Sequence, residues 1–404
     1  MRIDPAQHGW MTAPETIAVF AALGDARFVG GAVRNALLGT AVVDIDIAVP
    51  MPPSEAITRL VAKDIKVVET GIEHGTVTAV AGSHAFEITS LRRDVETDGR
   101  HAIVQFTDDW SEDAARRDFT INAMYATLDG EIFDYATGVE DLIAGRVRFV
   151  GDAATRIAED YLRVLRLFRF HAWYGKGEID PEGLRAAAAA KDKLKTLSAE
   201  RIAKEMLRLL EAGNPAPVLR VMAATGILPE LLPGALNLPR LDRLADIDAD
   251  NMFARDSVLR LASLLPDSDA AHAAADALKL SNAQRIRLEQ ALSGETLKAQ
   301  LSAREARRLL YRIGVARFRD KVLLAWAGRT AAAPGWRMLL DMAANWQKPR
   351  FPLTGMDVLQ AGVAEGPDVG RVLAKIEDWW IGTDFAADEG ACRDRLAEAV
   401  RDGA

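Results

Sequence analysis

Two acidic residues, Asp44 and Asp46, stand two positions apart in the β-prone run 42–49. Side chains two apart on a strand point to the same face, roughly 6–7 Å apart along it. Carboxylates held side by side repel each other unless a cation lies between them. Their oxygens suit Mg²⁺, which usually also binds substrate phosphates. The pair could therefore hold a metal, although by spacing alone the solvated face of an edge strand is the better interpretation.

The residues before this pair favour the metal site. The β-prone run 27–29 ends at Gly30 and Gly31, and helix formers follow over 32–38 until Gly39. Two glycines permit a tight turn and let backbone N–H groups approach a ligand closely. A phosphate is well placed at such a turn and helix N-terminus. We therefore expect a strand, a glycine turn, a short helix and the acidic strand to form one phosphate- and metal-binding unit.

This segment reads Gly-Gly-x-Val-Arg-x-x-Leu-Leu-Gly followed by Asp-x-Asp. It resembles the class II tRNA nucleotidyltransferase and poly(A) polymerase family, whose members are template-independent polymerases. The resemblance implies that the two glycines and Arg34 bind the triphosphate, and that Asp44 and Asp46 are catalytic and hold two Mg²⁺ ions. One departure is Asn35, where the family usually has Asp. Because Asn keeps the hydrogen-bonding shape, we expect a changed contact in an active site.

Composition sets broad limits on the protein class. The chain has 404 residues, and at roughly 150 residues per domain this indicates two to three domains. The N-terminus lacks the apolar core of a signal peptide, and no run approaches the roughly 18–20 apolar residues of a membrane helix. Cys392 is the single cysteine, which excludes an intrachain disulfide. We therefore expect a cytoplasmic protein.

The charge balance bears on the partner. The net charge of −8 argues against indiscriminate nucleic-acid binding, which depends on neutralising phosphates. We expect an RNA partner to be bound through local basic clusters. These clusters are Arg92-Arg93, Arg116-Arg117 and the series Arg163, Arg166 and Arg169.

The alternating run 85–89 places Phe86 and Ile88 on one face of a predicted strand and Glu87 on the other. If this strand neighbours the acidic strand, Glu87 becomes a third carboxylate in the site. From spacing alone an exposed strand glutamate fits equally well. The resemblance favours a catalytic Glu87, because the family sheet carries an acid there.

The stretch 91–113 is long, polar and poor in apolar pattern. Loops of this length in compact domains are usually functional or disordered, so we expect a mobile lid. An ordinary solvated loop is the alternative. In the family, the equivalent loop helps to switch specificity from C to A addition.

Residues 116–124 read Arg-Arg-Asp-Phe-Thr-Ile-Asn-Ala-Met. The first eight match the second motif of the family at every position, which implies that Arg117, Asp118 and Asn122 bind the nucleotide. Arg117 can donate to a phosphate or ribose oxygen, and Asp118 can accept from a ribose hydroxyl. A surface Arg–Asp pair that opens a helix is the alternative, and a match over eight consecutive residues disfavours it.

The run 155–173 has apolar residues near 3.6 periodicity, which predicts one helix. Glu159 and Asp160 lie one turn before Arg163, so Arg163 neighbours both acids. Asp160 can accept from the exocyclic amino group of cytosine or adenine while Arg163 donates to the adjacent ring acceptor. Such a pair would reject uracil and guanine. A salt bridge worth roughly 0.3–0.5 kcal/mol is the simpler interpretation.

The pattern Glu-Asp-x-x-Arg matches the fourth motif of the family, which implies nucleotide binding by these three residues. Arg166 and Arg169 continue the series at three-residue steps, and we expect them to bind the nucleotide as well. Because this stripe drifts around the helix, we expect Arg169 to face either phosphates or the neck core. The segment 198–210 resembles the fifth motif, which packs the neck, so we expect a structural role for Arg201.

An α+β fold follows from these elements. Residues Asp134, Gly138, Asp141 and Leu142 match the third, hinge-like motif of the family, so we expect the catalytic head to end near Gly145. Beyond Gly213 the pattern is almost entirely helical and carries no catalytic constellation. The predicted parts are a nucleotidyltransferase head with a small mixed sheet (1–145) and all-α neck (146–213), body (214–330) and tail (331–404).

We therefore expect an enzyme that adds C, C and A to the 3′ end of tRNA from CTP and ATP, releasing pyrophosphate. The family implies that body and tail bind the acceptor arm and elbow of the tRNA. The alternatives within the family are a poly(A) polymerase, or an enzyme that adds only CC or only A. A catalytically silent RNA- or nucleotide-binding module is the alternative of another class. Intact Asp44 and Asp46 count against that module, and Asn35 counts slightly for it.

Overall fold

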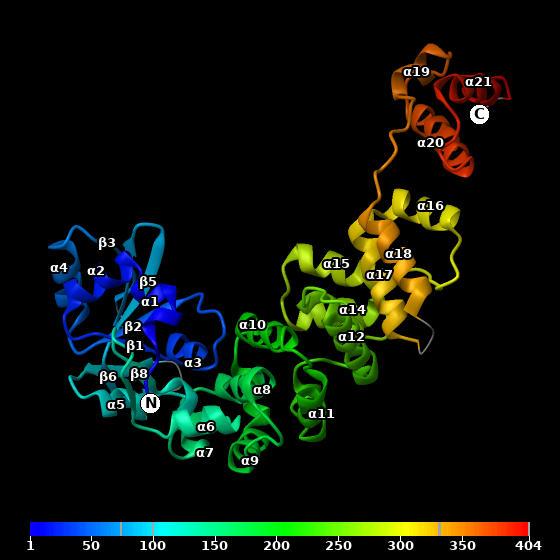
Figure 1. Cartoon of the computed structure of the whole chain (residues 1–404). Helices are drawn as coiled ribbons and strands as arrows, with labels where there is room; N and C mark the ends of the chain where they lie inside the picture. The colour runs from blue at the N-terminus through cyan, green and yellow to red at the C-terminus, as the bar shows by residue number, and fades with distance from the viewer. Residues whose placement is uncertain (73–74, 99–100, 330–332, 403–404) are drawn as a thin grey trace. The chain divides into compact units, whose positions relative to one another are not determined.

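The computed structural model describes residues 1–72, 75–98, 101–329 and 333–402. The chain divides into two compact units, Met1–Gly234 with Ala277–Lys279, and Ala235–Asp276 with Leu280–Ala404. In the part of the chain that the structure describes, every strand belongs to the first unit, and the second unit is helical (Figure 1). The predicted α+β class is confirmed. The four-part division at 145, 213 and 330 remains a prediction.

The first unit is built on a mixed sheet of seven strands in the order β3-β4-β5-β2-β1-β8-β9. β2 and β5 run parallel, and the other neighbouring strands run antiparallel. The bounds are β1 (Arg27–Val29), β2 (Ile45–Val49), β3 (Lys66–Gly71), β4 (Thr76–Ala81), β5 (His84–Ser90), β8 (Met124–Ala126) and β9 (Ile132–Asp134).

Three helices pack on this sheet. Helix α3 (Gly31–Leu37) contacts β1, β2 and β8, whereas α2 (Pro14–Leu23) and α4 (Pro53–Val61) contact each other and β4. Phe28 and Ile47 are fully buried in the core. These residues pair across β1 and β2, so the apolar positions of the predicted strands fix the sheet against its helices.

The stretch 91–113 is not a loop, and that prediction is wrong. It forms the hairpin β6 (Arg92–Asp98) and β7 (His101–Phe106) and enters α5 (Trp110–Ala115); residues 99–100 lie outside the described ranges. Within the described ranges, the two strands pair with each other in a separate two-stranded sheet. Such a ribbon is held by backbone hydrogen bonds between its own two strands, which need no apolar periodicity, and this explains why the sequence shows little apolar pattern there.

The expected single helix over 155–173 is also wrong. The chain forms α7 (Ala153–Glu159) and α8 (Leu162–Tyr174), with Asp160 in an extended conformation at φ −153° between them. The carboxylate of Asp160 accepts from the backbone N–H of Leu162 at 3.0 Å and so helps to start α8. A side chain that bonds its own backbone competes with helix continuation. Apolar periodicity runs on across the break, and therefore did not reveal it.

The first unit contains further helices on both sides of the sheet-forming part of the chain. α10 begins at Ala199, directly after Ser198, and ends at Leu210, so the segment that resembles the fifth motif is helical. The bounds are α1 (Gly9–Thr12), α6 (Gly138–Ala144), α9 (Pro181–Ala189), α10 (Ala199–Leu210) and α11 (Ala216–Ala224).

The second unit starts with α12 (Leu238–Asp250) and is helical, as the pattern beyond Gly213 predicts. Its C-terminal core gathers around Trp380, which is 3% exposed, and the buried Cys392. The remaining bounds are α13 (Ser257–Leu264), α14 (Ser268–Ala277), α15 (Asn282–Leu292), α16 (Ala303–Ile313), α17 (Val315–Ala327), α18 (Ala333–Ala344), α19 (Gly355–Gln360), α20 (Pro367–Gly382) and α21 (Glu389–Arg401).

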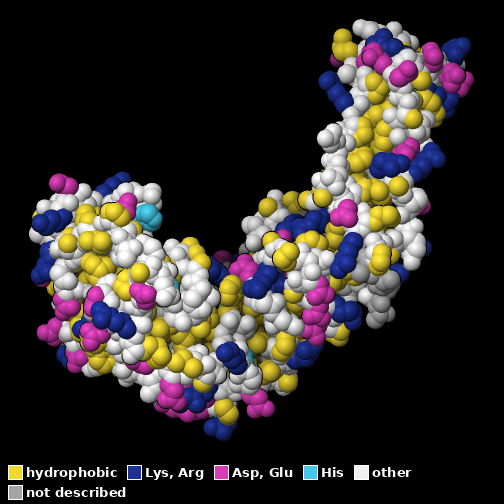
Figure 2. Space-filling model, viewed as in Figure 1, with side chains coloured by type: hydrophobic (Ala, Val, Ile, Leu, Met, Phe, Trp, Pro, Cys, Tyr) yellow, Lys and Arg dark blue, Asp and Glu magenta, His cyan; other side chains and the backbone are white. Residues whose placement is uncertain are grey.

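Charged side chains of both signs are interspersed over the face shown in Figure 2. The described residues include no helix that is both long enough and apolar enough to cross a bilayer.

Candidate active site

The acidic strand and β5 bring two carboxylates together. β2 begins at Ile45, so Asp44 lies just before the strand, and the predicted strand 42–49 is too long. Its partners β1 and β5 pair with it only from Ile45 onward, and pairing is what defines a strand end. Asp46 is the register partner of Glu87. Because register partners point to the same face, Glu87 stands beside Asp46, as expected if the two strands are neighbours.

Electrostatics at this edge disfavour the ionised form of Asp46. Burial, and then the adjacent charge of Glu87, raise the pKa of Asp46 to about 6, and Asp44 acts in the same direction. The nearby guanidinium groups of Arg117 and Arg34 oppose the shift. A cation bound at Asp46 would relieve this repulsion, so the local charge fits a metal ion.

The donor set fits a metal that shares its ligands with a substrate. Among the described residues, no three His, Cys, Asp or Glu side chains converge into a closed metal site. Asp44 and Glu87 are exposed and Asp46 is partly buried. Mg²⁺ commonly binds one or two carboxylates and completes its shell with water and substrate phosphates. Asp44 and Asp46 as metal ligands, with Glu87 as a third catalytic acid, therefore remain predictions that this geometry can accommodate.

The glycine turn forms as the sequence predicts. Gly30 has φ +63°, a left-handed conformation that favours glycine. Its N–H donates to the carbonyl of Met124 at 3.2 Å, and Gly31 opens α3. The turn is therefore tied to β8 while α3 starts beside the acidic strand.

Arg34 on α3 is 7% exposed, and burial lowers its pKa. Among the described residues its hydrogen-bond partners are uncharged: Nη2 donates to the Tyr174 hydroxyl at 2.9 Å, Nη1 donates to Asn122 Oδ1, and Nε donates to Asn35 Oδ1 at 3.3 Å. Its guanidinium also lies 4.2 Å from the ring centre of Tyr174. Asn35 thus contacts Arg34 without neutralising its charge, which is the changed contact we expect from replacing Asp.

The second motif links the head to α8. Asp118 accepts from Arg166 Nε at 2.7 Å, from Asn122 Nδ2 at 3.0 Å and from the N–H of Phe119 at 2.9 Å. Burial alone raises the pKa of Asp118, but the Arg166 guanidinium and these hydrogen bonds hold it below its usual range. Since Asn122 also accepts from Arg34, a continuous polar chain runs from the glycine turn to α8. The carboxylate of Asp118 therefore accepts hydrogen bonds from residues of the protein itself.

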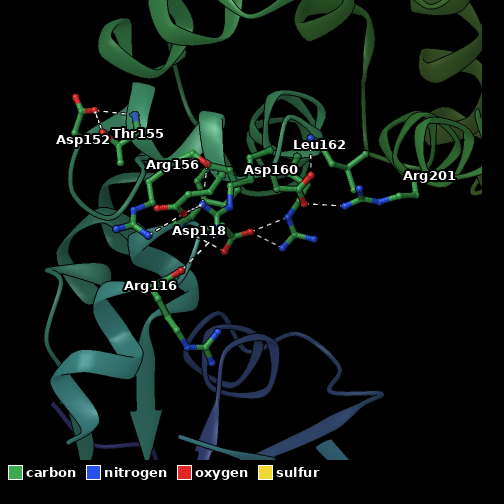
Figure 3. Close-up of polar contacts among 12 residues, drawn as sticks. Arg116, Asp118, Asp152, Thr155, Arg156, Asp160, Leu162 and Arg201 are labelled. Atoms are coloured by element: carbon green, nitrogen blue, oxygen red, sulfur yellow. Dashed lines mark hydrogen bonds and ion pairs between the residues drawn. The ribbon is translucent and has the colours of Figure 1, made fainter. Parts of the chain in front are cut away.

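Figure 3 shows the polar residues between α7, α8 and α10. Asp160 does not form an ion pair with Arg163; its carboxylate accepts from Arg201 at 2.7 Å. Arg163 instead pairs with Glu159 and donates to the carbonyl of Arg156 at 2.7 Å. The simpler interpretation, an i,i+4 salt bridge between Glu159 and Arg163, is therefore present. Asp160 and Arg163 are each held by another residue, and base recognition by them remains a prediction.

The two following arginines lie toward the neck interior. Arg166 binds Asp118 and lies 3.8 Å from Glu205 Oε1, while Arg169 pairs with Glu205 on α10. Glu205 is 7% exposed. We expected Arg169 to face either phosphates or the neck core, and in the structure it faces the neck core. The expected basic clusters are therefore largely matched by carboxylates, which reduces their capacity to bind RNA phosphates.

The third motif makes hydrogen bonds within its own segment and to the second motif. Asp134 accepts from the N–H groups of Gly138 and Val139, both at 2.9 Å, and so caps α6. Asp141 is fully buried and accepts from the Thr120 hydroxyl at 2.7 Å. These bonds hold α6 against the second motif.

Sequence reasoning missed several residues that support the site. Asp113 binds both Arg116 and Arg117, and its spacing of three and four residues on a helix could have revealed it. No local pattern pointed to Tyr125, Tyr174 or Glu205. These three contact their arginines across 8, 140 and 36 positions of the chain.

Two protein families match the chain: the Poly A polymerase head domain over residues 26–148, and the probable RNA and SrmB-binding site of polymerase A over residues 178–238. The chain is 35% identical to CCA tRNA nucleotidyltransferase 1, mitochondrial, of Homo sapiens, over 88% of this chain and 82% of that protein. It is 31% identical to a CCA-adding enzyme of Latilactobacillus sakei, over 87% of this chain and 89% of that protein.

The fold is also similar to that of a solved relative. The Bacillus stearothermophilus CCA-adding enzyme in complex with CTP superimposes with a TM-score of 0.75 at 27% identity, covering 96% of this chain and 97% of that one. The motifs described above lie within or between the two matched domains. The chain therefore belongs to the class II tRNA nucleotidyltransferase and poly(A) polymerase family.

Proposed function

We propose that this protein adds C, C and A to the 3′ end of tRNA from CTP and ATP, without a template, releasing pyrophosphate. The observation that carries the proposal is the pairing of Asp46 with Glu87 beside the glycine turn. Relatives at 31–35% identity bear the name CCA-adding enzyme or CCA tRNA nucleotidyltransferase. Identity over most of both chains supports carrying the activity over as a whole.

In this proposal the head binds the triphosphate. Gly30 and Gly31 let backbone N–H groups approach the phosphates, and Arg34 offers a guanidinium that bonds uncharged partners among the described residues. Arg117 stands near the same turn: a Cβ on Gly30 would lie 3.7 Å from its Nη1. Two cations at one glycine turn suit a polyphosphate.

Asp44 and Asp46 would hold two Mg²⁺ ions, with Glu87 supporting Asp46. When bound, such ions lower the pKa of the RNA 3′-hydroxyl and neutralise the leaving pyrophosphate. The family uses divalent metal ions; that the ion is Mg²⁺ and that two of them bind are parts of our proposal. The repulsion between the carboxylates of Asp46 and Glu87 would be relieved by a bound cation, which supports a metal site here.

The neck would select the base. Asp160 can accept from the exocyclic amino group of cytosine or adenine, and Arg163 can donate to the adjacent ring acceptor. In the free protein Arg201 holds Asp160, and Glu159 holds Arg163. Because both side chains are already held in place, binding of a base to them would cost little side-chain conformational entropy.

Three further features complete the proposal. The head, neck, body and tail divide near residues 145, 213 and 330. The helical body and tail bind the acceptor arm and elbow of the tRNA. The protein acts in the cytoplasm, although a relative at 35% identity is a mitochondrial protein.

The test is nucleotide incorporation with Mg²⁺ on three tRNA transcripts, ending before CCA, after C and after CC. Each transcript receives CTP, ATP, UTP or GTP alone, and then CTP with ATP. Stepwise C, C, A addition that stops is the expected result. Addition of only C or only A would place the chain in a split system, and long A tracts would make it a poly(A) polymerase. No incorporation with tRNA still bound would support the silent binding module.

A further inference from the structure

Asp113 on α5 is fully buried, and the proposed reaction gives it no role so far. Its Oδ1 accepts from Arg116 Nε at 3.0 Å and from the backbone N–H of Arg92 at 3.3 Å. Its Oδ2 accepts from Arg117 Nε at 3.1 Å and Nη2 at 2.9 Å, and from the Tyr125 hydroxyl at 2.6 Å. A carboxylate whose two oxygens both accept charge-assisted bonds is a rigid anchor.

The anchor keeps its charge at neutral pH. Burial alone would raise the pKa of Asp113, but the guanidinium groups of Arg117 and Arg116 and the Tyr125 hydroxyl lower it to about 2. Burial alone would also lower the pKa of Arg117, yet the Asp113 carboxylate raises it above the usual value. Both members of the pair are therefore ionised at neutral pH.

Tyr125 closes this arrangement from the sheet. Its hydroxyl donates to Asp113 and accepts from Arg117 Nε at 3.1 Å, so the three side chains form a closed triangle. Tyr125 is fully buried on β8, where it is the register partner of Val29, the residue before Gly30. Its ring packs edge-on against Trp110 at 5.2 Å. The hydroxyl is therefore fixed by the same strand pair that leads into the glycine turn.

The Nη1 edge of the Arg117 guanidinium lies next to the glycine turn. Asp113 and Tyr125 bind its Nε and Nη2, and its Nη1 lies nearest Gly30, 3.7 Å from where a Cβ would stand. The charge of Arg117 also lowers the pKa of Asp46. Its guanidinium thus acts on both the phosphate turn and the catalytic carboxylates.

We propose that Asp113 and Tyr125 are positioning residues that aim Nη1 of Arg117 at the phosphates of the incoming nucleotide. This inference rests on the proposed nucleotidyl transfer. The same anchor holds Arg92, the first residue of the β6–β7 hairpin. Asp113 accepts from the N–H of Arg92, and Arg116 Nε donates to the carbonyl of Arg92 at 2.9 Å.

Phosphates are common to CTP and ATP. Loss of the anchor should therefore slow C and A addition equally.

The test compares the wild type with Tyr125→Phe, Arg117→Ala and the double variant. Rates of single CTP and ATP incorporation are measured, together with thermal unfolding. Tyr125→Phe removes one buried hydrogen bond to a charged group, so we expect a folded protein with a modestly lower unfolding midpoint. It should lower kcat/KM by about tenfold for both nucleotides, the size expected for one hydrogen bond to a charged group. In the Arg117→Ala background, Tyr125→Phe should have no further effect, because it acts through Arg117.

Tyr135→Phe is the matched control. The variant keeps the ring, which packs edge-on against Tyr125 at 6.0 Å, and removes only a hydroxyl that accepts from Arg27 Nη1 at 3.1 Å, so incorporation should be unchanged. A folded Tyr125→Phe protein with wild-type rates would overturn the inference, as would an effect that multiplies with Arg117→Ala. Asp113→Asn is the stronger variant, but it is expected to cost stability because it weakens two buried ion pairs. A wild type that incorporates neither nucleotide would reject the proposed function itself, a result distinct from failure of this inference.

Discussion

Asp46 on β2 and Glu87 on β5 are register partners across a parallel pair of strands. Burial and the charge of Glu87 raise the pKa of Asp46 to about 6. Ionised carboxylates in this position oppose folding of the metal-free protein at neutral pH. Function-related strain of this kind is a common cost of an active site.

Asp46→Asn should therefore abolish nucleotide incorporation and stabilise the metal-free protein. The folded pKa of about 6 lies above the ordinary value of 3.8, so the cost is complete above about pH 6 and disappears below about pH 4. We expect a gain of about 1–3 kcal/mol near pH 8 that shrinks as the pH falls. Thermal unfolding in a chelator checks this. Asp44→Asn, at an exposed position, is the control, and lower stability of Asp46→Asn at high pH would contradict the account.

Removal of divalent ions should stop incorporation while tRNA binding persists. The carboxylates at Asp44 and Asp46 serve the reacting phosphates, and neither is needed to hold the RNA in this proposal. Incorporation is measured in a chelator and again after adding back Mg²⁺, alongside a filter-binding assay for tRNA. Undiminished C addition in the chelator would exclude metal-dependent transfer.

Asp160→Asn should reduce discrimination against UTP and GTP by at least about tenfold, because an amide can donate to the carbonyl that a carboxylate repels. Misincorporation relative to CTP and ATP is the measurement. Asp152→Asn is a matched control, since Asp152 only caps α7 through the N–H of Thr155 at 2.8 Å. Equal selectivity in Asp160→Asn and the wild type would assign Asp160 to the neck alone, as a partner of Arg201.

Gly138→Ala should destabilise the first unit by about 2 kcal/mol or more through overpacking. A Cβ at this position would lie 2.1 Å from the carbonyl oxygen of Thr120, so the second and third motifs would have to separate. Gly9→Ala is the control, because apart from its own helix backbone and chain neighbours no heavy atom of the described residues lies within 4 Å of its Cβ position. Comparable unfolding midpoints for both variants would mean that α6 is not packed as described.

Asp248→Ala should cost about 3–5 kcal/mol, because it removes the Asp248 carboxylate from a buried ion pair with Arg260. The two side chains pair at 2.9 Å with exposed fractions of 6% and 1%. Burial raises the pKa of Asp248 and lowers that of Arg260, so desolvation opposes both charges. Replacing both, as Asp248→Leu with Arg260→Met, should therefore cost clearly less than the single change. The exposed Glu398→Ala is the control, expected within about 0.5 kcal/mol.

The sequence alone determined which short segments carry the candidate site of the head. Gly30, Arg34, Asp44 and Asp46 lie within one short segment, and local rules for turns and strands place them together. The motif at 116–124 and the α+β class were likewise recoverable, because they depend on contiguous residues and apolar periodicity.

Only the tertiary structure decided which side chains meet. Asp46 beside Glu87, Asp160 with Arg201, and Arg34 with Tyr174 are contacts across 41 to 140 positions for which local spacing carries no signal. The hairpin over 92–106 and the break at Asp160 escaped prediction for a related reason. Backbone pairing within a separate ribbon, and a side chain bonding its own backbone, leave no mark on the apolar pattern.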